Sequence, residues 1–324
     1  MINETKSIFF SIILPTYNVA KHIDRCLESC VKQTYTNFEV IVVDDCGTDD
    51  SIKKADQWAE LDSRIKIVRN PKNLGTYHAR RHGVEEARGD YIVFLDPDDA
   101  LDQKALELIS CEVYTTPVDI VLYGVKEVPV NNKRKVDLPR RTFNNEELLK
   151  KLFLEKKKLG YGTPGKAFLK ATLHKAYDAI KADVNDRLVY AEDALLFYTV
   201  SLLSNASVSI AHPLYIYFRE FDSITNKNSD GDVIFKSKQV CLVVSYIYRI
   251  LYYYGGSNKT AEEAGKKVIG KLLSDGALIK RNVKSYNYSN NYLKNVYESF
   301  KMRGGCADII RIICYVSSLG RVKL

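Results

Sequence analysis

The sequence predicts an α/β protein with a mostly parallel central sheet and a helical C-terminal extension. Apolar, β-rich runs recur about every 27 residues within the first 125, and stretches with helical patterning separate them. The last third is helical in pattern and rich in tyrosine and lysine. Nearly continuous apolar strands that alternate with helices indicate a parallel sheet covered on both faces, and 324 residues with 46% hydrophobic content suffice for such a core.

The composition excludes several classes of protein. A charged fraction of 27% with 11% aromatic residues is typical of a soluble globular chain and not of collagen-like, low-complexity or small disulfide-framework proteins. Seven cysteines without a CxxC pair indicate reduced thiols and favour neither disulfides nor a zinc site. The apolar runs Ile8–Leu14 and Val240–Tyr254 are too short for a signal-peptide core with its cleavage site and for a bilayer span, respectively. We therefore expect a cytoplasmic protein.

Four apolar runs predict the first strands of the sheet. They are Ile8–Leu14, Phe38–Val43, Ile65–Val68 and Tyr91–Leu95. Each run is followed at once by polar residues. These are Pro15 to Asn18, Asp44 and Asp45, Arg69 and Asn70, and Asp96 to Asp99. Because open parallel sheets bind ligands at the carboxyl ends of their strands, we expect these groups to converge on one rim.

Weaker patterns predict the rest of the chain. Val118–Val125 is a further strand, and a polar loop or hairpin follows it near residues 131–135. Residues 143–204 have helix and loop patterns, with a glycine-rich interruption at 159–166 and a helix start near Glu192. A polar break follows Arg219, and the sequence from about residue 232 is helical to its end.

Three carboxylates follow the fourth strand directly. Packing Asp96, Asp98 and Asp99 together on a sheet rim is electrostatically costly, and a divalent cation would offset the repulsion. Carboxylate oxygens suit Mg²⁺ or Mn²⁺, which can also bridge a diphosphate. A solvated turn with helix-capping aspartates is the alternative that the local pattern leaves open.

Two further features point to a nucleotide-like ligand. The strand that ends at Asp44 places a carboxylate where it could accept hydrogen bonds from a base or ribose, although capping by Asp45 or Asp49 would also explain the pattern. Asn73–Thr76 leads into a helix that carries Arg80. A helix N-terminus with a nearby guanidinium group favours an anion such as a diphosphate.

Glu192 and Asp193 stand at a predicted helix start. Acidic residues there interact favourably with the helix dipole, or one of them could take the proton of an acceptor hydroxyl. The pattern by itself leaves both roles open.

Taken in order along the chain, these motifs resemble the family 2 glycosyltransferases of the GT-A fold, which bind nucleotide-sugars. The resemblance covers roughly residues 8–225. Its motifs are Ser11–Asn18 (SIILPTYN), Val42–Asp45 (VVDD), Asn73–Gly75 (NLG), Ala79–Arg80, Phe94–Asp99 (FLDPDD) and Glu192–Asp193. It implies an inverting transfer of a sugar from a UDP-sugar donor to a saccharide or glycolipid acceptor, with Mn²⁺ or Mg²⁺ as cofactor, and no nucleic-acid partner.

The resemblance also implies roles for individual residues. The residues that would bind the nucleotide-sugar are Pro15, Tyr17, Asn18, Asp44, Arg80, Asp96 and Arg219. Tyr17 would stack on the base. Asp96 and Asp98 would form the DxD motif, with Asp98 the direct metal ligand. Asp193, beside Glu192, would be the catalytic base.

More narrowly, Asn73–Tyr77, Ala79–Arg80 and Gly83–Glu85 resemble bacterial β-1,3-galactosyltransferases that extend lipooligosaccharide. We therefore expect a hexosyltransferase, with galactose as the transferred sugar and a bacterial surface glycolipid or polysaccharide as acceptor. We expect residues 1–228 to form the catalytic domain and residues 229–324 a basic, tyrosine-rich helical region. A nucleotidyltransferase, or a nucleotide-sugar-binding protein without transfer activity, is the alternative.

The positive charge of the chain is concentrated in its C-terminal third. Residues 230–324 contain 16 Lys and Arg against 7 Asp and Glu, whereas residues 1–229 are nearly balanced. This asymmetry indicates an anionic partner for the region, either lipid or nucleic acid, or else only a solvated helical surface. A stripe of apolar residues with helical spacing could add an apolar face for a membrane interface. The stripe consists of Ile309, Ile312, Ile313 and Val316. We expect peripheral attachment to the inner face of the inner membrane, with packing on the catalytic domain or in a homo-oligomer as the alternative.

Overall fold

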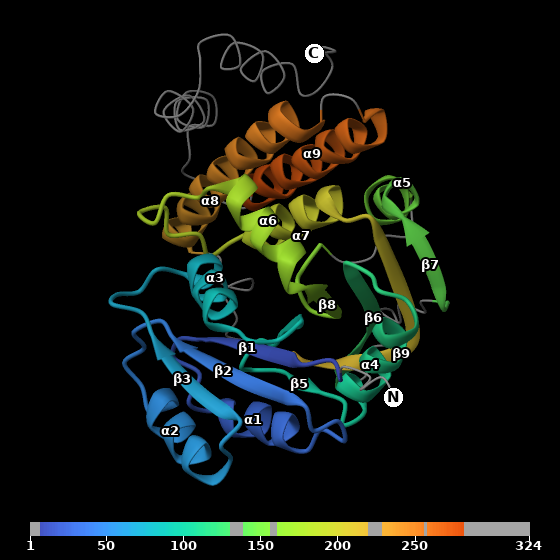
Figure 1. Cartoon of the computed structure of the whole chain (residues 1–324). Helices are drawn as coiled ribbons and strands as arrows, with labels where there is room; N and C mark the ends of the chain where they lie inside the picture. The colour runs from blue at the N-terminus through green and yellow to red at the C-terminus, as the bar shows by residue number, and fades with distance from the viewer. Residues whose placement is uncertain (1–6, 130–138, 156–160, 220–228, 256–257, 282–324) are drawn as a thin grey trace.

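A computed structural model of the chain describes residues 7–129, 139–155, 161–219, 229–255 and 258–281 (Figure 1). Within these ranges one mixed sheet has the strand order β3-β2-β1-β4-β8-β6-β9-β5, and β7 pairs with β9. The strands are β1 (Phe10–Thr16), β2 (Phe38–Asp44), β3 (Ile65–Arg69), β4 (Tyr91–Phe94), β5 (Ala100–Leu101), β6 (Ile120–Val128), β7 (Arg141–Asn144), β8 (Lys166–Leu169) and β9 (Ala206–Phe218).

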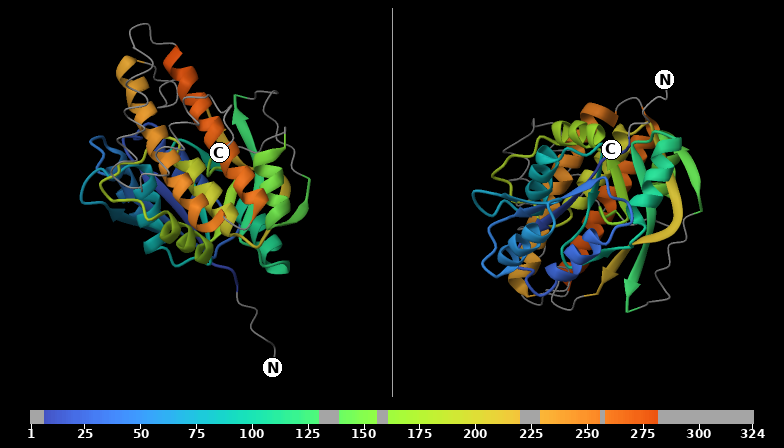
Figure 2. Two further views of the ribbon diagram at one scale, coloured as in Figure 1. Left: turned by 90° about the horizontal axis from the view of Figure 1, so that it is seen from above. Right: turned by 60° about the horizontal axis from the view of Figure 1, so that its bottom comes forward.

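Helices cover both faces of the sheet (Figures 1 and 2). They are α1 (Ile23–Val31), α2 (Ser51–Leu61), α3 (Thr76–Glu86), α4 (Ala105–Thr115), α5 (Asn145–Leu149), α6 (Lys170–Ile180), α7 (Glu192–Leu203), α8 (Asp230–Ile250) and α9 (Lys259–Arg281). Two π-helical turns, η2 (Lys150–Leu154) and η3 (Leu251–Gly255), extend α5 and α8.

Side-chain alternation along the strands creates the two cores. In β2, Ile41 and Val43 face the core under α3, α6 and α7, while Val40 and Val42 face the core under α1 and α2. Each successive strand residue points to the opposite face, so a strand buried on both sides consists of a continuous apolar run. This is why the first four strands are visible in the sequence as local patterns.

The predicted α/β fold class is correct, and the first four strands pair in parallel as expected. The prediction of only helix and loop over residues 143–204 is wrong, because β8 lies there and pairs antiparallel with β4 and β6. With only four residues and Lys166 among them, β8 is too short to show a strand period. The helix start predicted near Glu192 is confirmed by α7.

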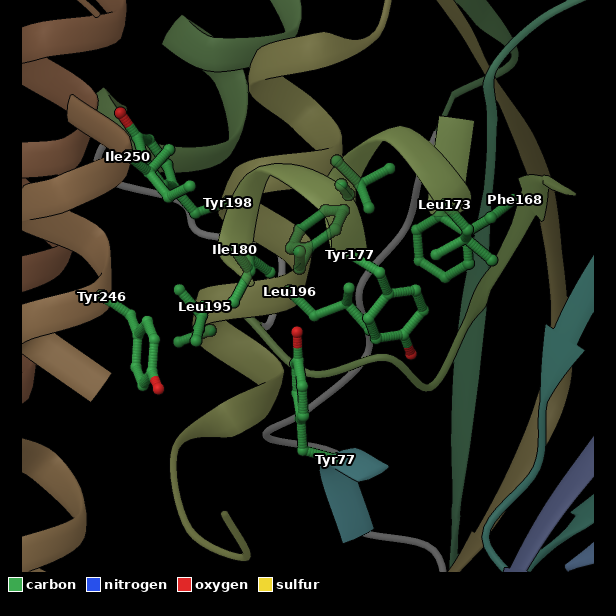
Figure 3. Close-up of a cluster of buried hydrophobic side chains, with 14 of the residues drawn as sticks. Tyr77, Phe168, Leu173, Tyr177, Ile180, Leu195, Leu196, Tyr198, Tyr246 and Ile250 are labelled. Carbon is green, nitrogen blue, oxygen red and sulfur yellow. The ribbon is translucent and has the colours of Figure 1, made fainter. Parts of the chain in front are cut away.

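The C-terminal helices share a core with the rest of the molecule. Residues of α8 and α9 belong to the same apolar cluster as α3, α6 and α7 (Figure 3). The division between residues 228 and 229 therefore remains a prediction about roles rather than about packing. The predicted stripe near Ile309 lies outside the described residues. In the part of the chain that the structure covers, no helix has the length and apolar character needed to cross a membrane.

Candidate functional site

The carboxyl ends of β1, β2 and β4 lie next to one another and form the rim on which the predicted residues gather. Thr16 at the end of β1 is paired in register with Asp44 at the end of β2. On the other side of β1, the amide of Leu95 donates to the carbonyl of Ile13 at 3.0 Å, which places the segment after β4 beside the same edge. Parallel pairing thus brings together residues that are 28 and 82 positions apart in the chain.

The nucleotide side of the rim carries Pro15, Tyr17, Asn18 and Asp44. Tyr17 is 45% exposed, and Pro15 and Asp44 are half-buried. The side-chain oxygen of Asn18 accepts hydrogen bonds from the amides of Thr48 and Asp49 at 2.7 and 3.3 Å. The Asn18 side chain therefore orders the loop after β2, while Tyr17 and Asp44 present an aromatic ring and a carboxylate at neighbouring strand ends.

Asp45 has a different position from Asp44. It is buried, and its carboxylate accepts hydrogen bonds from the Asn70 side chain at 2.7 Å and from the amides of Leu74 and Gly75 at 2.8 and 2.9 Å. The alternative of a helix-capping Asp45 is thus not what the structure has, because its carboxylate contacts the loop that precedes α3. This contact holds Gly75, the residue before α3, whose φ of 87° is a conformation suited to glycine.

Arg80 of α3 lies at the centre of a buried cluster of charges. One guanidinium nitrogen is 2.7 Å from Asp96, and the other is 2.5 Å from Asp193 and 3.2 Å from Glu192. Burial alone would lower the pKa of Arg80, but the negative charges of Asp193, Asp96 and Glu192 hold that pKa well above its usual value. In the structure both terminal nitrogens of the Arg80 guanidinium contact carboxylates. The diphosphate contact predicted for Arg80 remains a prediction.

The two acids at the start of α7 differ in environment. Glu192 is buried, and burial together with the charge of Asp193 raises its pKa to about 8. The side chain of Asp193 is 31% exposed and so can meet an incoming molecule. Residues 161–165 pass close by, since a Cβ atom built on Gly162 would lie 3.4 Å from an Asp193 oxygen. A carboxylate held by an arginine and open on one side can accept a proton from a bound hydroxyl.

The three acids after β4 separate in the fold. Asp96 and Asp98 are half-buried on the rim, whereas Asp99 turns into the core. There Asp99 accepts hydrogen bonds from the Tyr215 hydroxyl at 2.6 Å and the Phe218 amide at 2.8 Å. Burial, with the charges of Asp96 and Asp98, raises the pKa of Asp99 to about 8. The expected three-acid rim is therefore corrected to a pair.

This pair fits a hard divalent cation. Mg²⁺ and similar ions take carboxylate oxygens and usually bind through one or two of them, with the remaining positions filled by water and substrate phosphates. Among the described residues no three His, Cys, Asp or Glu side chains gather into a metal cluster. Asp96 and Asp98 are thus the residues that could hold such an ion.

Arg219 pairs with an acid outside the Arg80 cluster. It follows β9, and its guanidinium contacts the buried Glu127 of β6 at 2.8 Å. Its predicted contact with the nucleotide-sugar remains a prediction. A different arginine lies beside the acid pair, because Arg25 of α1 donates a hydrogen bond to the backbone carbonyl of Asp98 and stacks 3.5 Å from the centre of the Phe218 ring. Arg25 was not among the predicted site residues, because no sequence motif surrounds it.

Lys166 of β8 was also missed. It is buried, and its ammonium donates hydrogen bonds to the carbonyls of Gly162 at 2.5 Å and Pro164 at 3.0 Å. Burial lowers the pKa of Lys166 to about 7, and the charge of Asp193 opposes this effect. In the sequence, a lysine next to a glycine-rich stretch could have indicated a loop that the lysine holds beside the site.

Comparisons with known proteins address the same region. The family described as Glycosyl transferase family 2 matches residues 11–178. Glycosyltransferase GlyG of Streptococcus pneumoniae is 27% identical over 232 residues, which cover 69% of this chain and 75% of that protein. The cholesterol galactosyltransferase of Borreliella burgdorferi is 27% identical over 237 residues, covering 70% of this chain and 64% of that protein.

The solved structure of S. aureus TarS 1-349 in complex with UDP-GlcNAc is similar in fold. Its TM-score is 0.65 at 21% identity, and the match covers 97% of this chain and 88% of that chain. At this identity the likeness concerns the fold, and it confirms the GT-A architecture that the sequence predicts.

Proposed function

The chain belongs to glycosyl transferase family 2, and from this premise we propose that it transfers a hexose from a UDP-sugar to a saccharide acceptor with inversion at the anomeric carbon. One observation carries the proposal. Arg80 contacts both Asp96, from the acid pair after β4, and Asp193 at the start of α7, which are 16 and 113 positions from it in the sequence. One guanidinium thereby holds a member of the acid pair suited to the donor diphosphate and an accessible carboxylate suited to the acceptor.

Asp193 acts as the base in this mechanism. Its carboxylate takes the proton of the acceptor hydroxyl while that oxygen attacks the anomeric carbon of the donor. The bond between the anomeric carbon and the diphosphate oxygen breaks, and UDP leaves with the bonding electrons. A single displacement inverts the anomeric configuration and needs no covalent sugar intermediate.

The remaining residues hold the donor. Tyr17 stacks on the uracil ring, Asp44 accepts hydrogen bonds from the nucleoside, and the Arg80 ion pairs keep Asp96 in place. Asp98 and Asp96 would hold Mn²⁺ or Mg²⁺, which when bound supplies positive charge to the leaving diphosphate. Arg25, beside Asp98, adds a cation to the same side of the site.

Galactose is the sugar that we propose. Two observations support it: the resemblance of Asn73–Glu85 to β-1,3-galactosyltransferases and the similarity to a relative named for galactosyl transfer. The similar TarS structure was solved with UDP-GlcNAc, so N-acetylglucosamine is the alternative sugar. The proposed acceptor is a saccharide of a bacterial surface glycolipid or polysaccharide.

The first experiment compares several nucleotides and UDP-sugars and tests a variant of the proposed catalytic base, Asp193. We expect UDP to bind more tightly than GDP or CMP in calorimetry, and UDP-galactose to release UDP faster than UDP-glucose or UDP-GlcNAc, with water or aryl glycosides as acceptors. Asp193→Asn should lower turnover about 10²–10⁴-fold, as loss of a general base does, without weakening UDP binding. Asp178→Asn on the exposed face of α6 is the control.

Other outcomes discriminate the alternatives. Near-normal turnover in folded Asp193→Asn would refute the assignment of the base, and equal binding of the three nucleotides would refute the uridine pocket. Tight UDP-sugar binding without any turnover would favour a nucleotide-sugar-binding protein. A product with retained configuration would contradict the single displacement.

A further inference from the structure

The segment between α6 and α7 delivers Glu192 and Asp193 to the site, and its own backbone is poorly suited to do so. Residues 181–191 contain turns but no helix or strand. Ala191, the residue before α7, has φ of 64° and makes no side-chain cap. An L-residue in this left-handed region costs about 1–2 kcal/mol, so the conformation persists only if contacts outside the segment maintain it.

Gln239 of α8 makes two of those contacts. Its side chain is buried, with 7% of the residue exposed. The amide oxygen accepts a hydrogen bond from the Val189 backbone N–H at 2.9 Å, and the amide nitrogen donates to the Arg187 carbonyl at 2.9 Å. One side-chain amide thus pairs with the backbone on both sides of Leu188, as a neighbouring strand would.

Tyr246, two turns further along α8, lies on the same face of the helix. Its hydroxyl donates to an Asp186 carboxylate oxygen at 2.5 Å and accepts from the Asp183 amide at 3.0 Å. Figure 3 shows its ring beside Leu195 of α7, on the α8 side of the shared core. The two polar side chains of α8 therefore hold the segment at four residues, namely Asp183, Asp186, Arg187 and Val189.

On the opposite side the same segment contacts α3, which carries Arg80. The Tyr77 amide donates to the Leu188 carbonyl at 3.1 Å, and the His78 ring nitrogen lies 3.1 Å from the Asp186 carbonyl. The segment is thus held between α3 and α8. Its position decides whether Asp193 reaches the Arg80 guanidinium.

We propose that Gln239 and Tyr246 are positioning residues for the Glu192–Asp193 pair, so that α8 acts on the reaction through the segment between α6 and α7. The inference rests on Asp193 as the base of the proposed function. The apolar residues of α8 pack in the shared core independently of these two polar groups. Loss of the polar contacts should therefore make the Asp193 carboxylate more mobile, while α8 and the donor site keep their structure.

Two conservative variants test the proposal in the full chain. Tyr246→Phe removes only the hydroxyl. Gln239→Met removes both hydrogen bonds and keeps a side chain of similar length. The probe is UDP release from the UDP-sugar that reacts fastest in the first experiment. We expect each variant to lower kcat about tenfold, while the KM for the donor and the Kd for UDP stay within twofold. Amide hydrogen exchange should accelerate in residues 183–193 and stay unchanged in β1, β2 and β4.

Matched controls come from the same part of the molecule. Tyr252→Phe changes a tyrosine that is 71% exposed just after α8, and Lys238→Met changes the exposed neighbour of Gln239. Both should leave kcat unchanged. In the Asp193→Asn background, Tyr246→Phe and Gln239→Met should cause no further loss, because they act through the base that is already missing.

The outcomes separate this inference from the proposed function. If Asp193→Asn keeps normal turnover, the base assignment in the proposed function fails, and the positioning role fails with it. If Asp193→Asn loses turnover but the two α8 variants keep kcat, or lower it equally in the Asp193→Asn background, the positioning role is wrong while the base assignment stands. A rise in donor KM or UDP Kd without a fall in kcat would also overturn it.

Discussion

Arg80 is buried against three carboxylates, and at the scale of single residues this arrangement sets the protonation of the site. Glu192 is the most deeply buried of the three. Its raised pKa means that the folded chain retains a proton that the unfolded chain has released. With that proton Glu192 is neutral, so Arg80 is left to balance the two charges of Asp96 and Asp193.

The first prediction at this scale is a pH dependence of stability that depends on Glu192. Its pKa rises from an ordinary 4.5 to about 8 on folding. Between these values the folded state binds more protons than the unfolded state, so its stabilising contribution is complete below about pH 4.5 and is lost as the pH rises to about 8. The free energy of unfolding changes with pH by at most about 1.4 kcal/mol per pH unit through this one group.

Glu192→Gln should remove this slope. In urea unfolding between pH 5 and pH 8, the free energy of unfolding of the variant should rise relative to that of the wild type as the pH increases. Glu263→Gln, on the exposed face of α9, should run parallel to the wild type. Parallel curves for Glu192→Gln as well would contradict the burial argument.

The second prediction at this scale concerns Asp98 and the divalent cation. A chelator should abolish UDP release from a UDP-sugar, and Mn²⁺ or Mg²⁺ should restore it, because two carboxylates alone cannot neutralise a departing diphosphate. Asp98→Ala should not recover at metal concentrations that restore the wild type. Asp178→Asn should recover fully. Undiminished turnover in chelator would rule out the assignment of the acid pair.

At the scale of elements, the position of α3 depends on a close approach at Gly83. A Cβ atom there would lie 2.4 Å from Cγ2 of Ile13 in β1 and 3.1 Å from Cγ2 of Val43 in β2. The helix can therefore lie directly on the sheet only because residue 83 has no side chain. Arg80 is one turn earlier on the same helix, so its reach to Asp96 depends on this packing.

Gly83→Ala should accordingly affect stability and activity together. Overpacking of this kind costs about 1–3 kcal/mol, and we expect a loss of that size in urea unfolding together with a lower kcat. Gly231→Ala at the start of α8 is the control, since its nearest contact would be 3.9 Å away. Replacing Ile13 by Ala in the Gly83→Ala chain should recover part of the activity, and no recovery would argue against the clash.

At the scale of the whole molecule, charge is distributed unevenly. The surplus of Lys and Arg over Asp and Glu lies in residues 230–324. In the described part of this region, Tyr252 and Tyr253 are 71% and 70% exposed where α8 meets η3. Basic residues attract anionic headgroups, each adding on the order of 1 kcal/mol near the surface, and tyrosine is favoured at the interface.

The corresponding prediction is reversible binding to anionic membranes. The intact chain should co-sediment with vesicles in proportion to their content of anionic lipid, and less at high salt. Deletion of residues 304–324 should weaken this binding. If the folded protein does not bind anionic vesicles even at low salt, the basic region serves the fold or a second copy of the chain.

Much of the site was predictable from local patterns. The strand runs before Asp44 and Asp96 are buried on both faces and therefore continuous in the sequence, and parallel topology places their ends on one rim. The helix start at Glu192 follows from the sequence in the same way. Each of these inferences needs only the residues within one element.

The partners of the charged groups were decided by the tertiary structure. Arg80 contacts acids 16, 112 and 113 positions away, Asp99 turns from the rim to Tyr215, and Arg219 contacts Glu127. The sequence determined the fold class, the strand ends and the set of candidate side chains, because these depend on apolar periodicity along the chain. Which charge meets which depends on distances of a few ångströms between elements, and such distances exist only once the helices have packed on the sheet.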